Sequence, residues 1–194
     1  MPRNRGNYGI CPQNLHFMIW SAIASGHGGT PLKWSGMDCL EEQTAAATFC
    51  DTMASEGILQ QMTVRMLPHP TQEPTSEPVV IGMRSTDKAT VMVWVFHDDT
   101  IDGQQSGRTY ALSQADYLKD NNKTAVVVGL TPGATYSVTP YNTWSGARED
   151  QQECQVPNQT ADGDGKITIP VKRLAETTRE AWDGADIMYV LKRT

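Results

Sequence analysis

Histidines and carboxylates are the side chains of this sequence that could support chemistry. His27 stands in a short glycine-rich connection and Asp38 follows it, and either side chain could take part in the site of a hydrolase. A Ser-His-Asp triad with Ser25 or Ser35 has weaker support, because the GxSxG pattern of a nucleophile elbow is absent. No two of the four histidines have the i, i+4 spacing of a helical zinc site. We therefore take His27 and Asp38 as the candidate catalytic residues.

The sequence DGDG at 162–165 is the candidate metal site. Alternating acidic residues that end in a glycine are similar to half of a calcium loop. A complete EF-hand loop would need an acidic ligand at its first position and a bidentate Glu at its twelfth, where this sequence has Thr160 and Val171. A tight turn that leads into a strand is the favoured interpretation, and a weak calcium site at Asp162 and Asp164 is the alternative. No motif requires a cofactor.

A second acidic cluster consists of Asp98, Asp99 and Asp102. Clustered carboxylates could bind calcium or act in catalysis. Aspartate is also frequent in hairpin loops, because its side chain accepts hydrogen bonds from nearby backbone N–H groups. A solvated turn is the favoured interpretation of this cluster.

Three aromatic side chains, Trp34, Tyr141 and Trp144, are candidates for binding a carbohydrate substrate. Aromatic rings present a flat apolar face that can pack on the C–H surface of a pyranose ring. Trp34 and Trp144 each precede a Ser-Gly pair, which favours an exposed or pocket position. Trp20 and Trp94 lie on apolar faces of their segments and are predicted to belong to the core.

Hydrophobic periodicity predicts two helices in the first third of the chain. Residues 13–25 place apolar side chains at i, i+3, i+4, i+7 and i+8, and glycines follow. The second helix is expected over about 40–56, where three consecutive alanines favour helix and Gly57 occupies the expected C-terminal position. Residues 68–78 contain four prolines and are predicted to be a linker between a helical segment, 1–67, and a second domain.

Residues 79–194 are predicted to form an antiparallel β-sandwich, so the expected fold class is mainly β. Runs rich in Val, Ile, Thr, Tyr and Trp alternate with turn sequences at the spacing typical of a sandwich. A further extended segment is expected at 30–36, before the second helix. The predicted strands of the sandwich cover 79–85, 89–97, 107–112, 124–129, 134–143, 151–156, 166–171 and 186–192.

The composition narrows the classes of partner. Hydrophobic residues make up 39% of the 194 residues and charged residues 20%, as in soluble globular proteins. The formal net charge of −6 and the lack of a basic run argue against nucleic acid. The longest apolar-leaning stretch, 17–24, is too short to cross a membrane, and the N-terminal residues lack the apolar core of a signal peptide. The four cysteines lack metal-site spacings and are expected to be free or packing residues. The cellular location is not indicated.

The segment 14–38 resembles the last βα unit of certain (β/α)8-barrel glycoside hydrolases. In those enzymes a helix of the form H-x-x-x-W-x-x-x-x-S-G is followed by G-T-P, an aromatic-rich eighth strand and an acidic residue. The sequences PGATYSVTPYNTWSG and DIMYVLK are likewise similar to strands of their C-terminal β-sandwich. The matching positions of the first segment are His16, Trp20, Ser25-Gly26, Gly29-Thr30-Pro31, Trp34 and Asp38.

The resemblance implies that the chain corresponds to the C-terminal portion of such an enzyme. A retaining glycosidase uses two carboxylates about 5 Å apart, and the family places them on the fourth and seventh barrel strands, which have no counterpart in this sequence. Asp38 would then line a substrate pocket. Helices taken from a barrel also need a new cover for their apolar faces. We expect them to fold back on the sandwich, with a homodimer as the alternative.

Three functions are compatible with these observations. The first is a small hydrolase related to glycosidases, with a site between the helical segment and the sandwich, whose substrate could also be an ester or a lactone and which could depend on calcium. The second is a non-catalytic sandwich that binds carbohydrate as an accessory module. The third is a fragment of a longer glycosidase. The expected partner is a carbohydrate or another small-molecule substrate.

Overall fold

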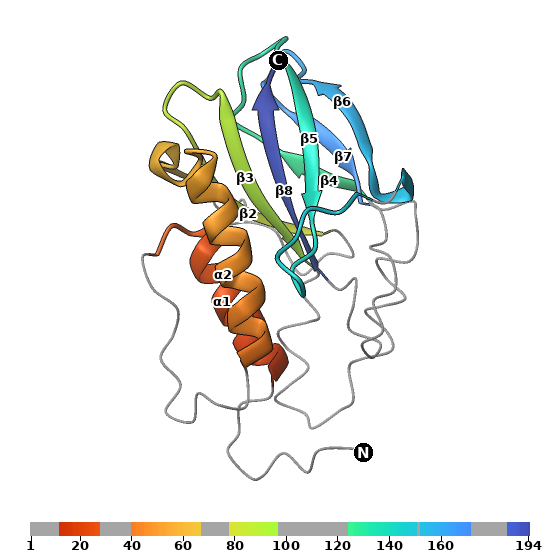
Figure 1. Cartoon of the computed structure of the whole chain (residues 1–194). Coiled ribbons are helices and arrows are strands. Elements are labelled where there is room, and N and C mark those ends of the chain that lie inside the picture. The colour runs from red at the N-terminus through yellow and green to blue at the C-terminus, as the bar shows by residue number, and fades with distance from the viewer. Residues whose placement is uncertain (1–11, 28–39, 67–77, 97–123, 151, 172–185) are drawn as a thin grey trace.

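The computed structural model describes residues 12–27, 40–66, 78–96, 124–150, 152–171 and 186–194 (Figure 1). In this part the chain is mainly β, with eight antiparallel strands in two sheets and two α-helices. The predicted fold class is therefore confirmed. No helix of the described residues is long and apolar enough to cross a membrane.

The two α-helices begin and end close to where the sequence predicts. Helix α1 covers Pro12–Ala24 and α2 covers Leu40–Ser55. Each is followed by a glycine at positive φ, Gly26 at 70° and Gly57 at 69°. After α1, the N–H of His27 donates to the carbonyl of Ala22, and after α2 the N–H of Ile58 donates to that of Met53. These six-to-one hydrogen bonds are those of a Schellman motif, which glycine permits because it has no Cβ.

The larger sheet has six strands in the order β1-β2-β3-β8-β5-β6. Every neighbouring pair is antiparallel. The central strands are β3 and β8, and all seven residues of β3 are buried. The six strands cover Val64–Met66 (β1), Val79–Arg84 (β2), Thr90–Phe96 (β3), Thr135–Tyr141 (β5), Val156–Thr160 (β6) and Asp186–Arg193 (β8).

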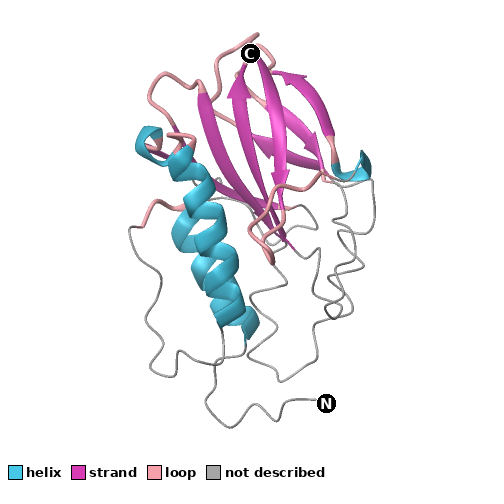
Figure 2. Ribbon diagram, in the orientation of Figure 1, coloured by secondary structure: helices cyan, strands magenta, loops and turns pink. Residues whose placement is uncertain are grey.

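The smaller sheet pairs β4, Thr124–Val127, with β7, Ile167–Pro170. It covers one face of the larger sheet. Apolar side chains from β3 and β8 form one core with it, and the alternate side chains of the same strands form a second core with the helices. Figure 2 shows the helices on one side of the large sheet. The described residues thus form three layers, and the expectation that the helices fold back on the sandwich is confirmed.

Several strand boundaries differ from the prediction. The segment expected as a strand at 151–156 instead contains a short 3-10 helix, Gln152–Cys154, and the strand begins only at Val156. A second 3-10 helix, Leu59–Gln61, follows α2. Strand β1 was not predicted, and it joins the helical segment to the large sheet by pairing with β2. The predicted segments 30–36 and 107–112, and the linker apart from Pro78, lie outside the described residues.

The turn after β5 lies directly against α2. Gly146 has φ 71°, and a Cβ added there would be 1.8 Å from the carbonyl oxygen of Ala45. Gly133, in the turn before β5, has nearly the same φ, 72°, but a Cβ there would meet nothing within 4 Å. An alanine at either position therefore adopts the same unfavourable backbone conformation, but only an alanine at position 146 also clashes with the helix.

We expect Gly146→Ala to destabilise the protein more than Gly133→Ala. The left-handed backbone should cost about 1–2 kcal/mol in both variants, and the clash with α2 should add roughly 1–3 kcal/mol in Gly146→Ala alone. Urea unfolding of both variants and the parent measures the difference. Equal losses would show that the turn does not press on the helix.

Candidate functional site

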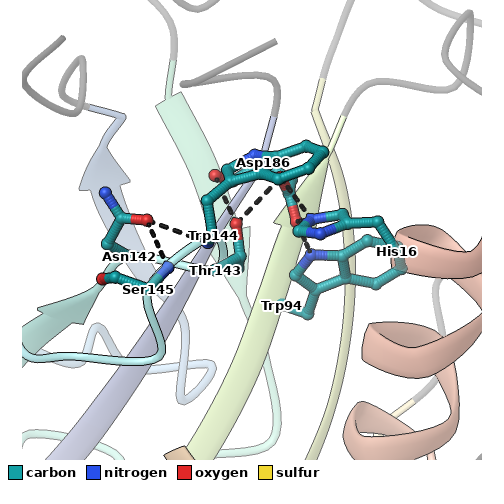
Figure 3. Close-up of polar contacts among 7 residues, drawn as sticks. All are labelled: His16, Trp94, Asn142, Thr143, Trp144, Ser145 and Asp186. Atoms are coloured by element: carbon teal, nitrogen blue, oxygen red, sulfur yellow. Dashed lines mark hydrogen bonds and ion pairs between the residues drawn. The ribbon is translucent and has the colours of Figure 1, made fainter. Parts of the chain in front are cut away.

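Asp186, the first residue of β8, is the centre of a buried polar cluster (Figure 3). Its side chain is completely buried. The Nε2 atom of His16 lies 3.1 Å from Oδ1 and 3.0 Å from Oδ2. The indole Nε1 of Trp94 donates to Oδ2 at 2.6 Å, and the hydroxyl of Thr143 donates to Oδ1 at 3.0 Å. Both carboxylate oxygens are therefore occupied by donors from the protein.

These donors come from parts of the chain that only the fold brings together. His16 lies in the second turn of α1, and 170 positions separate it from Asp186. Trp94 is on β3, two residues from Phe96, which pairs with Asp186 in the sheet. Thr143 lies just beyond the end of β5. The cluster thus links the helical layer to three neighbouring strands of the large sheet.

Burial makes this cluster energetically demanding. A carboxylate removed from water is stable only when hydrogen bonds and an opposite charge compensate it. The Nε2 atom of His16, itself completely buried, and the donors Trp94 and Thr143 surround Asp186 and supply hydrogen bonds. Because a carboxylate oxygen accepts hydrogen bonds, the form of His16 that carries a hydrogen on Nε2 is the one that can donate to Asp186. The arrangement holds two layers together and leaves no oxygen of Asp186 free for a substrate.

Trp144 packs on a face of the His16 ring. Its ring stacks on the imidazole with centroids 3.8 Å apart and planes 9° from parallel. The residue is partly exposed. Its backbone is held in a tight turn, because the N–H groups of Trp144 and Ser145 both donate to the side-chain oxygen of Asn142, at 2.8 and 3.1 Å. Trp144 is therefore an aromatic side chain in a fixed position at the edge of the cluster.

Only one of the two predicted catalytic residues, His27, lies in the described part of the chain. His27 is exposed and directly follows the last turn of α1. Asp38 and the predicted substrate-binding Trp34 lie outside the described residues, as do Asp98, Asp99 and Asp102. The catalytic role of His27 and Asp38 stays a prediction.

Tyr141, also predicted to bind substrate, lies in the core. It is only 4% exposed, and Phe49 of α2 packs edge-on against it with ring centroids 5.2 Å apart. The structure therefore leaves no face of this ring open to a sugar, and the position is a correction to the prediction. Tyr136 and Val138 of β5 face the smaller sheet, whereas Tyr141 lies on the opposite face of the strand and belongs to the core that the helices share with the large sheet. Trp20 and Trp94 are buried as predicted.

The DGDG sequence forms a tight turn. The Oδ1 atom of Asp162 accepts hydrogen bonds from the N–H groups of Asp164 and Lys166, at 2.9 and 2.8 Å, and Asp164 pairs with the Lys166 ammonium at 3.2 Å. Gly165 has φ 73° and lies against the carbonyl of Leu130. Among the described residues no three His, Cys, Asp or Glu side chains are grouped to hold a metal ion. The turn explains both aspartates, and calcium binding stays a prediction.

Comparison with protein-family models and with curated proteins finds no match to this chain. The site is therefore defined by its geometry alone. Sequence reasoning noticed His16 only through the resemblance and did not select Asp186. The available signals were a histidine on the apolar face of a helix and a carboxylate at the start of an otherwise apolar strand, and neither identifies the other as its partner.

We expect Asp186→Ala to destabilise the protein by about 3–5 kcal/mol, because it removes the acceptor of several buried donors. Asp164→Ala, which removes an exposed carboxylate from a turn, is the control and should have a much smaller effect. Urea unfolding of the two variants measures the comparison. A loss for Asp186→Ala no larger than the control would show that the buried cluster is not required for stability.

Two acidic groups in the helix–sheet core have raised pKa values. Burial raises the pKa of the Cys50 thiol, and the neighbouring Asp51 carboxylate raises it further. Burial also raises the pKa of Tyr141, with a smaller contribution from Glu56. A raised pKa in the folded state means that folding favours the neutral form. Each group's contribution to the free energy of unfolding is complete below its ordinary pKa, about 8.5 for a thiol and 10 for a phenol. It is lost as the pH rises through the higher pKa of the folded state.

The free energy of unfolding should therefore decline above about pH 9. A Cys50→Ala, Tyr141→Phe double variant lacks both groups and should decline less over the same range. Urea unfolding of parent and double variant, at neutral pH and at several alkaline values, tests this. Parallel pH profiles for the two proteins would contradict the assignment.

Proposed function

We propose that this chain is a non-catalytic carbohydrate-binding accessory module of the glycoside-hydrolase type, and that Trp144 contacts the sugar. The observation that carries the proposal is the position of Trp144, a partly exposed indole stacked on His16 above a buried polar cluster. One face of the ring is covered by the imidazole. The opposite face is the one proposed to receive a pyranose.

The rigidity of Trp144 supports a binding role. An aromatic ring with a fixed orientation loses little conformational entropy when a ligand packs on it. The turn that carries Trp144 is held by Asn142 and by the close contact of Gly146 with α2. Such a ring is prepared for a flat apolar partner, which a sugar ring offers through its axial C–H groups.

The burial of Asp186 supports the absence of catalysis. Among the described residues, His16 and Asp186 are a histidine and a carboxylate in direct contact, and both are completely buried. The Asp186 oxygens already accept hydrogen bonds from Trp94 and Thr143. A general base must reach the proton that it removes, and this pair is closed to a substrate.

The locations of the resembling motifs also fit an accessory role. The histidine and tryptophan of the H-x-x-x-W helix, the N-T-W-S-G turn and the first residue of the last strand meet at the helix–sheet interface. What the chain shares with the glycosidases is then a way of attaching a helix to a sandwich. That is a structural role, and it needs no catalytic carboxylate pair.

We expect the purified chain to be retarded by at least one polysaccharide in affinity electrophoresis, and Trp144→Ala to weaken that binding about tenfold. Loss of one aromatic stack of roughly 1.4 kcal/mol corresponds to this factor. Trp144→Phe keeps an aromatic face and should bind more tightly than Trp144→Ala. Retardation of Trp144→Ala equal to that of the parent would exclude Trp144 as the contact residue.

A parallel activity screen tests whether the chain lacks catalytic activity. The parent chain should show no hydrolysis of glycosides, esters or lactones, with calcium or with a chelator. Hydrolysis that disappears in His27→Ala and Asp38→Ala would overturn the proposal in favour of the hydrolase hypothesis.

A further inference from the structure

We infer that docking of helix α1 on the sheet and the binding-competent orientation of Trp144 are one coupled equilibrium, with Asp186 as the positioning residue. The identity of the ligand in this inference rests on the proposed function. The coupling itself rests only on contacts within the chain.

The orientation of Trp144 depends on a ring that belongs to α1. Its indole Nε1 is buried and has no hydrogen-bond partner. The turn fixes the backbone of Trp144, but the indole makes no hydrogen bond that would fix the orientation of the ring. The stack on His16, with planes 9° from parallel, is the contact that sets the ring plane. When α1 leaves the sheet, Trp144 loses this support.

The orientation of His16 depends in turn on Asp186. One imidazole nitrogen, Nε2, contacts both carboxylate oxygens, whereas Nδ1 has no hydrogen-bond partner. The carboxylate is itself held by Trp94 of β3 and by Thr143, the residue next to Trp144. Asp186 therefore acts on Trp144 from two directions, through the ring beneath it and through the backbone beside it.

The apolar contacts make the helical layer dock as a unit. Trp20 of α1 packs against Phe49 of α2, with ring centroids 5.2 Å apart. Both belong to the core that α1 and α2 share with Met92 and Met188 of the large sheet. Gly146, two residues after Trp144, touches the backbone of α2. Undocking of the helices thus removes contacts from both sides of the turn that carries Trp144.

Thermodynamic linkage gives the functional consequence. If Trp144 binds a sugar only while α1 is docked, the sugar must stabilise the docked state by the same factor by which docking improves binding. With free ligand at a hundred times its Kd, the population of the undocked state falls roughly a hundredfold. Helix α1 then contributes to the affinity for the ligand through its contact with Trp144.

A ligand-free experiment tests the coupling independently of the proposed function. The full chain is labelled with 5-fluorotryptophan, and the signal of Trp144 is assigned by its absence in Trp144→Phe. Urea unfolding of this signal gives the free energy at which Trp144 loses its folded environment. Amide hydrogen exchange gives the opening free energy of α1, and the two values are compared. Equal opening free energies are expected. A Trp144 signal that keeps its folded position while α1 amides exchange would overturn the inference.

Variants then test Asp186 as the positioning residue. Asp186→Asn should accelerate exchange of α1 amides by at least roughly tenfold and shift the Trp144 signal toward that of a solvated indole. Asp164→Asn, in an exposed turn, should change neither. An unshifted Trp144 signal in folded Asp186→Asn would contradict the assignment. If Asp186→Asn does not fold, the parent comparison in urea still decides the coupling.

A ligand arm connects the two proposals. Hydroxyethyl cellulose and polygalacturonate are added separately to the parent chain, as a neutral and an acidic probe. A probe that binds through Trp144 should slow exchange of the α1 amides, and binding through Trp144 without slowing would overturn the coupling. Binding of neither probe would count against the proposed function, while the ligand-free comparison would still decide the coupling.

Discussion

A carboxylate without contact to water has to be surrounded by donors, and the donors around Asp186 come from separate segments of this chain. His16 belongs to a helix, Trp94 to a central strand and Thr143 to the end of another strand. Asp186 fixes the relative positions of the three, because a buried polar group that lacks its hydrogen bonds is costly. The attachment of the helical layer and the fixed position of Trp144 both follow from this constraint.

The three-layer arrangement explains why such a polar cluster can exist in so small a protein. The large sheet is covered by helices on one face and by two strands on the other, so its central strands are buried on both sides. Apolar contacts supply most of the attraction between the layers, but they are not directional. The cluster at one end of the sheet adds direction and sets the register of α1, a role that buried polar groups have in other proteins.

The resemblance to barrel glycosidases takes a specific meaning from the structure. Those of its motifs that fall in the described residues, around His16, around Trp144 and at the start of β8, lie where the helices meet the sandwich. His16 and Asp186, which belong to these motifs, therefore contribute to the attachment of the helices. We therefore propose an accessory role for the chain, in which the partly exposed Trp144 ring, and not the buried Asp186, contacts a ligand.

The sequence by itself determined the features that depend on neighbouring residues. The ends of α1 and α2, most strands of the sandwich and the turn at Asp162 follow from local periodicity, glycine conformation and side-chain hydrogen bonds to nearby backbone. Only the tertiary structure decided that Tyr141 is covered by α2, and that His16 meets Asp186 across 170 positions. Such contacts depend on which faces of distant elements pack together, and no local pattern records that.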